Sequence, residues 1–155
     1  MKQIKSAPLA FILSLALPAA VVAQAEPTVH KETLPDAVDF KPFAIPGFDP
    51  GVKLAVLHGD PNAESGDYTL RLWFPAAYKF PAHWHPGAEH LTVLEGNLQL
   101  GMGDTYNGGK LTSYPVGSFL YIPAKMAHYG MAKVPTVIQL HGQAPFKIEL
   151  GKPTP

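Results

Sequence analysis

The stretch that decides the fold and the candidate site is Phe80-Pro81-Ala82-His83-Trp84-His85-Pro86-Gly87-Ala88-Glu89-His90. Residues two apart on a β-strand point to the same face, so His83 and His85 can present their imidazoles side by side. A His-x-His pair by itself is more often a polar surface pair than a metal site. The pair therefore becomes informative only together with the residues that follow it.

Glu89 begins the next predicted strand, after a turn that Pro86-Gly87 indicates. Alternation places Glu89 on the same face as Leu91 and Val93, which are residue types that fill a barrel interior. We therefore expect the carboxylate to point inward, where an unpaired charge is costly and a metal ion would neutralise it. His90 takes the opposite face and is predicted to be a surface or interface residue.

A fourth ligand is predicted farther along the chain, at His128. The stretch from Gly117 to His128 contains a short strand, a turn that begins at Pro123, and a histidine that opens the return strand. The chain has no cysteine, so any transition-metal site must use nitrogen and oxygen ligands. Three imidazoles and a carboxylate suit one divalent transition metal (Fe, Mn, Zn, Ni or Cu), and the pattern does not choose among them.

The rest of the chain predicts an all-β fold. Short β-branched and aromatic runs are separated by Gly, Pro, Asn and Asp, and no apolar period of 3.6 residues persists. The 155 residues suit a single domain, as a two-sheet jelly roll or closed barrel over residues 51–150. The predicted strands are Val52–His58, Tyr68–Phe74, Ala82–His85, Glu89–Leu94, Asn97–Gly101, Phe119–Ile122, His128–Ala132, Val134–His141 and Phe146–Leu150.

Residues 1–25 have the order of a secretory signal peptide. Lysines precede a short apolar run, and Ala23-Gln24-Ala25 supplies a cleavage site. A membrane anchor is the alternative, but Pro18 breaks the run and it falls short of the ~20 apolar residues that cross a bilayer. We expect a periplasmic or secreted protein with no stable membrane anchor after cleavage. Residues 26–50 are Pro-rich and predict an extended arm, and residues 151–155 form a short tail.

The charges make a nucleic-acid partner unexpected. The chain has 12 Lys plus Arg and 12 Asp plus Glu, so no excess of positive charge favours phosphate backbones. No serine has a neighbouring His/Asp group for nucleophilic catalysis, and no glycine-rich loop opens a helix that would bind phosphate. The partner that we expect is a small molecule.

Two segments together resemble the signature motifs of the cupin superfamily. The first, His83-Trp84-His85-Pro86-Gly87-Ala88-Glu89, closes with Glu95-Gly96, and the second runs from Gly117 through Pro123 to His128. The resemblance implies a cupin-type jelly-roll β-barrel, a metal held by His83, His85, Glu89 and His128, and a homodimer. The sequence departs from the second motif at Lys125 and Ala132, where glycine and asparagine are common in the superfamily.

Three further residues are candidates for a catalytic role. Alternation places Gln139 and His141 on one strand face and Ile138 and Leu140 on the other. If the first face lines the cavity, Gln139 can orient a substrate and His141 can exchange a proton near neutral pH. Tyr121 is the third candidate, as a hydrogen-bond donor from the same inner wall. A solvent-facing surface, and a packed core position for Tyr121, are the alternatives.

Two classes of function follow from these residues. The first is a metal-dependent enzyme of dioxygenase, isomerase or lyase type that acts on a small organic molecule, in which the ion supplies Lewis acidity or reaction with dioxygen. The second is a non-catalytic periplasmic module that binds or senses a metal or small ligand. The absence of an evident general base outside the ligands favours the second class. A fold resemblance by itself does not name a reaction.

Overall fold

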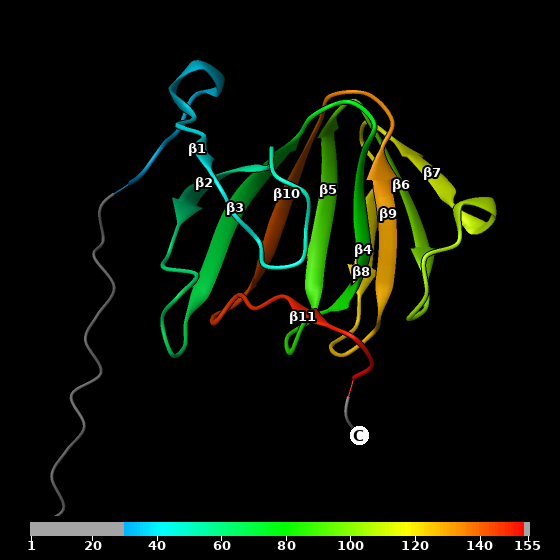
Figure 1. The fold of residues 1–155 in the computed structure, drawn as a ribbon. Helices are drawn as coiled ribbons and strands as arrows, with labels where there is room; N and C mark the ends of the chain where they lie inside the picture. The colour runs from blue at the N-terminus through cyan, green and yellow to red at the C-terminus, as the bar shows by residue number, and fades with distance from the viewer. Residues whose placement is uncertain (1–29, 154–155) are drawn as a thin grey trace, which may run out of the picture. The chain divides into compact units, whose positions relative to one another are not determined.

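Two antiparallel β-sheets face each other in the computed structural model, which describes residues 30–153 (Figure 1). The first sheet, called sheet A here, has the strand order β1 (Lys41–Pro42), β2 (Lys53–His58), β3 (Asp67–Phe74), β10 (Thr136–Gln143), β5 (Glu89–Glu95) and β8 (Phe119–Ile122). The second, sheet B, has the order β11 (Glu149–Leu150), β4 (Tyr78–Trp84), β9 (His128–Ala132), β6 (Asn97–Met102) and β7 (Thr112–Pro115).

The helical content of the described residues is two 3₁₀ turns, at Pro35–Ala37 and Gly108–Lys110. The all-β prediction is therefore confirmed, as is the jelly-roll arrangement of paired sheets. None of the helices in residues 30–153 is long and apolar enough to cross a membrane. The predicted signal peptide, residues 1–25, lies outside the described residues.

Sheet A forms because its strands alternate apolar and polar residues. On β3 the side chains of Tyr68, Leu70, Leu72 and Phe74 are buried, while the residues between them are partly exposed. Alternation of this kind gives each strand one face for the core and one for solvent. A fully buried aliphatic or aromatic side chain contributes about 1.5–3 kcal/mol of transfer free energy, so this face stabilises the packing of the two sheets.

Strand β4 contains an irregularity that the sequence does not reveal. Its register with β9 shifts between Phe80 and His83. Strict alternation would place Phe80 and His83 on opposite faces, yet both side chains are buried. A bulge adds a residue on one strand and changes which side chains point inward beyond it. The same strand therefore supplies an apolar wall and, beyond the bulge, His83, with His85 following directly after the strand.

Several strand boundaries differ from the prediction. Strand β4 begins at Tyr78 instead of Ala82, and β11 covers only Glu149–Leu150 of the predicted Phe146–Leu150. Strand β7 was not predicted, because Thr112–Pro115 has no buried residue and so lacks an alternating apolar pattern. Within the Pro-rich segment, β1 pairs with β2 at the edge of sheet A, with Lys41 opposite Leu54.

Candidate metal site

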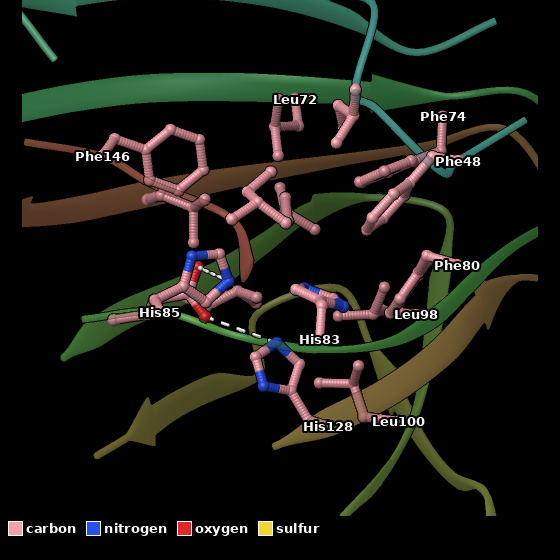
Figure 2. A pocket seen from close by; sticks show the side chains of 16 residues that line it. Phe48, Leu72, Phe74, Phe80, His83, His85, Leu98, Leu100, His128 and Phe146 are labelled. Carbon is pink, nitrogen blue, oxygen red and sulfur yellow. Dashed lines mark ion pairs between the residues drawn. The ribbon is translucent and has the colours of Figure 1, made fainter. Parts of the chain in front are cut away.

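The four predicted ligands line one pocket in the interior of the fold, and Figure 2 labels the three histidines. His83 is on β4 and directly opposes His128, the first residue of β9. His85 follows the end of β4, and Glu89 is the first residue of β5 on the facing sheet. The three histidines offer ligand atoms within 4.8 Å of one another, and all three side chains are buried. They form a group that can hold a metal ion.

The Nδ1 atom of each histidine forms a hydrogen bond with a backbone carbonyl. The acceptors are Pro81 O for His83 at 2.8 Å, Lys147 O for His85 at 2.7 Å and Met126 O for His128 at 3.0 Å. Because a carbonyl can only accept, each Nδ1 must carry the proton, and a neutral ring then has its lone pair on Nε2. Such outer hydrogen bonds set the tautomer and orientation of metal-binding histidines. The three imidazoles are thus prepared to ligate through Nε2.

Glu89 completes the group from the other sheet. Its Oε1 atom lies 3.3 Å from Nε2 of His85, and its Oε2 atom lies 3.5 Å from Nε2 of His128, as the dashed lines in Figure 2 show. The side chain is almost fully buried, and Oε2 takes part in no hydrogen bond. The 3.5 Å approach is therefore proximity, not a bond that satisfies this oxygen. A buried oxygen facing histidine lone pairs fits a cation between them.

Burial shifts the pKa values of the three histidines in the direction that suits metal binding. Loss of hydration and, to a smaller extent, the nearby His128 lower the pKa of His83 to about 2 and that of His85 to about 4. Burial also lowers the pKa of His128. These histidines are therefore neutral at neutral pH, which is the form that binds metal. Burial raises the pKa of Glu89 to about 8, so the charged carboxylate is disfavoured there unless a cation compensates its charge.

Apart from the four candidate ligands, the described residues that line the pocket all have apolar side chains. They come from both sheets and from two segments outside the central strands, and they are Ile45, Phe48, Leu72, Phe74, Phe80, Leu91, Leu98, Leu100, Ile138, Leu140, Phe146 and Ile148. Figure 2 labels several of these apolar side chains around the histidines. Apolar walls with a few converging polar groups are typical of small-molecule sites.

Two segments that connect strands contribute to the pocket, and we call them the mouth segments. The first is residues 43–52, between β1 and β2, and the second is residues 144–148, between β10 and β11. Phe48 from the first packs edge-on to His83 at 5.2 Å between ring centroids, and Phe146 from the second stacks on His85 at 5.4 Å. These residues were not predicted, because nothing local in their sequence indicates that they return to the site.

The mouth segments also contact a candidate ligand and neighbouring parts of the fold. Lys147 of the second segment provides the carbonyl that holds the His85 imidazole. A Cβ atom at Gly47, which has φ +79°, would overlap the side chain of Leu150, so glycine allows the first segment to approach β11 closely. The amide of Phe146 donates to Pro61 O at 2.7 Å. Both segments are thus part of the site's construction.

The three predicted catalytic residues lie on the outer face of sheet A, away from the pocket. Ile138 and Leu140 line the pocket, so alternation turns Gln139 and His141 outward, and His141 is exposed. Tyr121 on β8 is 57% exposed, while its neighbours Leu120 and Ile122 are buried. The placement of these three residues on the inner wall is therefore wrong. The alternation was predicted correctly, but it does not say which face meets the core.

The positions of His90 and Lys125 in the structure can be compared with the sequence prediction. His90 is exposed on the outer face of β5, as predicted. Lys125 has φ 61°, the left-handed conformation that glycine adopts most easily, and its amide donates to His85 O at 2.8 Å. The cupin motif often has glycine at this position, and the backbone conformation gives the physical reason. The departure leaves the turn and the adjacent His128 in place.

The fold and the site together define a cupin-type β-barrel with a three-histidine, one-glutamate group in its interior. Residues 33–147 match the profile of the ChrR cupin-like domain family. The chain therefore belongs to this family, and the resemblance inferred from the two motifs is confirmed. No curated protein matches the chain.

Solved structures with the same fold have low sequence identity to this chain. The polyketide cyclase RemF from Streptomyces resistomycificus superposes with a TM-score of 0.65 at 18% identity, over 81% of this chain and 88% of its own. A putative acetylacetone dioxygenase from Methylibium petroleiphilum gives 0.55 at 22% identity, over 76% and 79%. The lyase DddQ from Ruegeria pomeroyi gives 0.57 at 16% identity, over 74% and 61%. At these identities the likeness establishes the fold.

Proposed function

We propose that this protein is an exported, divalent-metal-dependent enzyme that acts on a small organic molecule. The observation that carries the proposal is the convergence of three neutral Nε2 atoms and a buried carboxylate inside an apolar pocket. A metal held there would supply Lewis acidity or redox chemistry. His83, His85, Glu89 and His128 hold the ion, while the apolar walls exclude water and strengthen electrostatic interactions inside the pocket.

The reaction types that we consider are those of a dioxygenase, an isomerase or a lyase. The names of the structural neighbours, which include a cyclase, a putative dioxygenase and a lyase, support small-molecule chemistry on this fold. They do not choose a reaction for this chain. The metal's identity would separate oxygen chemistry from Lewis-acid chemistry, since redox-active Fe or Cu favours the former.

A non-catalytic module that binds or senses a metal or small ligand is the second candidate. One observation favours it: among the residues that the structure describes, the pocket wall has no side chain that can donate or accept a proton apart from the four candidate ligands. General acid–base catalysis would then depend on Glu89 or on the substrate itself. A binder would be stabilised by its ligand without converting it.

The test begins with elemental analysis of the mature protein, purified without added metal or an affinity tag. We expect near-stoichiometric metal in the wild type and none in the His83→Ala, His128→Ala double variant. The metal-loaded protein is then incubated with small carboxylic acids, phenols and carbonyl compounds, in air and under nitrogen, and their loss is followed by NMR. Consumption that Glu89→Ala abolishes supports the enzyme. Ligand-dependent stabilisation with no consumption supports the binding module.

Export and a homodimer remain proposals. Export rests on the signal-like order of residues 1–25, and it is tested by the N-terminal sequence of protein recovered from the periplasm and medium, which we expect to begin at Glu26. The homodimer rests on the cupin resemblance and is supported by Phe119 and Tyr121, which are 62% and 57% exposed on edge strand β8. Light scattering of the purified protein measures its oligomeric state.

A further inference from the structure

The distribution of polar groups in the pocket limits the kind of molecule that it can take. The polar side chains that line the pocket are the three histidines and Glu89, and all the other lining side chains are hydrocarbon or phenyl. Within residues 30–153, no lysine, arginine, hydroxyl or amide side chain lies in the wall. A ligand can therefore form polar side-chain interactions at one end only, where the metal would lie.

Charge balance at the metal end of the pocket indicates which charge the ligand should carry. A divalent ion with one carboxylate and three neutral imidazoles carries a net charge of +1, and the pocket wall offers no further charge. A buried net charge is costly, so a ligand that brings one negative charge gives a neutral centre. A neutral ligand would leave a positive charge uncompensated, and a dianion would leave a negative one.

The size of the pocket sets a third limit. The free volume between the side chains is about 40 Å³, which is room for about three water molecules. A ligand of more than a few heavy atoms requires the side chains at the mouth to turn aside. Phe48 and Phe146 are the aromatic side chains placed to do so, because they come from the mouth segments and not from the paired strands.

We propose that the site selects small, mainly apolar molecules with a single monoanionic oxygen group at one end, and that it rejects polyols, sugars and dianions. This inference rests on the proposed metal site, although it does not require turnover. Along the apolar part of such a ligand, each added methylene group strengthens binding about fourfold until the pocket is full. Each hydroxyl buried there without a partner weakens binding by about tenfold.

The experiment measures binding to the mature protein loaded with Co²⁺, by calorimetry and by the visible spectrum of the ion. The probes are acetate, butanoate and hexanoate, with adipate and gluconate as six-carbon comparisons that add a second charge or five hydroxyls. We expect affinity to rise from acetate to butanoate, and adipate and gluconate to bind at least tenfold more weakly than hexanoate. Equal affinities for hexanoate, adipate and gluconate would overturn the inference.

A charge added at the mouth provides a second, independent measurement. Phe48→Lys places an ammonium group beside the pocket, so adipate binding should improve relative to hexanoate by at least tenfold. Val134→Lys adds the same charge in the exposed turn between β9 and β10 and should leave the ratio unchanged. An unchanged ratio in Phe48→Lys would count against selection by the pocket wall.

The outcomes separate this inference from the proposed function. If Co²⁺ binds and the acids are discriminated as expected but no compound is ever consumed, the inference stands and the enzyme proposal fails. If compounds are consumed but the acids are not discriminated, the enzyme proposal stands and the inference fails. If no divalent metal binds, both fail.

Discussion

Glu89 and His90 are adjacent on β5, yet they lie in opposite environments. Glu89 is buried against His85 and His128 on the inner face of sheet A, and burial raises the pKa of its carboxyl group to about 8. His90 is exposed on the outer face, where it pairs with His141 on the neighbouring strand β10 and lies beside the ring of Tyr121. One residue of offset separates a candidate ligand from a surface side chain.

The outer face of sheet A has an ordinary polar network of its own. Arg71 donates to Gln139 Oε1 at 3.0 Å, and the Thr69 hydroxyl lies 2.9 Å from Nδ1 of His141. The rings of Phe119 and Tyr121 add an aromatic surface near His90. These groups satisfy one another or face solvent, so none needs a metal. The comparison teaches that histidine and glutamine mark a site only when the fold turns them inward.

The largest expected effect contrasts the two neighbours on β5. Glu89→Ala should remove metal from the purified protein, because Glu89 is the one acidic side chain among the described residues that line the pocket, and affinity should fall by more than the roughly 10- to 100-fold typical of outer-shell changes. His90→Ala should leave the metal content unchanged. Elemental analysis and competition with a chelator measure both. Equal metal loss in the two variants would contradict the assignment of the inner face.

The second effect contrasts two neighbours on β10. Leu140 is 1% exposed and lines the pocket, so Leu140→Ala should reduce the free energy of unfolding of the metal-free protein by about 2–5 kcal/mol. Gln139→Ala removes only hydrogen bonds on the outer face and should cost about 0.5–1.5 kcal/mol. Urea unfolding of both variants gives the values. Similar losses would indicate that Gln139 also supports the core.

The third effect is a pH dependence of the metal-free protein. The three histidines have pKa values below their usual 6.5, so the unfolded chain binds more protons and stability rises as the pH approaches 6.5. Burial raises the pKa of Glu89 from 4.5 to about 8. Between these two pH values the folded protein holds a proton on Glu89 that the unfolded chain releases, so stability falls as the pH rises from 4.5 to about 8. Three histidines outweigh one glutamate below pH 6.5.

We therefore expect the metal-free protein to be most stable near pH 6.5 and to lose stability toward pH 8. Glu89→Gln cannot ionise, so the decline above pH 6.5 should be much smaller in that variant. Urea titrations at half-unit pH steps, in the presence of a chelator, compare the two proteins. A parallel decline in both would show that a different group controls the alkaline limb.

The smallest effect concerns the turn that positions His128. Lys125 has φ 61°, and a left-handed conformation costs a residue with a Cβ about 1–2 kcal/mol. Lys125→Ala retains this strain, while Lys125→Gly removes it. The glycine variant should therefore be more stable than the alanine variant by about 1 kcal/mol, and both should retain metal. Thermal unfolding of the two variants measures the difference, and a more stable alanine variant would contradict the strain argument.

Much of this protein was determined by its local sequence. The period of two and the turn residues specify short strands, because a strand with one apolar face can be stable only in a sheet with a buried side. The spacing of His83, His85 and Glu89 specifies that two imidazoles share a face and that a carboxylate follows the turn. These relations involve residues close in the chain. The second motif then adds His128 to the predicted ligand set.

The tertiary structure decided which face of each strand meets the core. Alternation correctly grouped Gln139 with His141, but only the pairing of β10 with β3 and β5 turned Ile138 and Leu140 inward instead. The shift between Phe80 and His83 on β4 likewise depends on pairing with β9. Phe48 and Phe146 reach the histidines through contacts between distant segments. Such contacts are set by the packing of the whole barrel, which no single stretch of sequence contains.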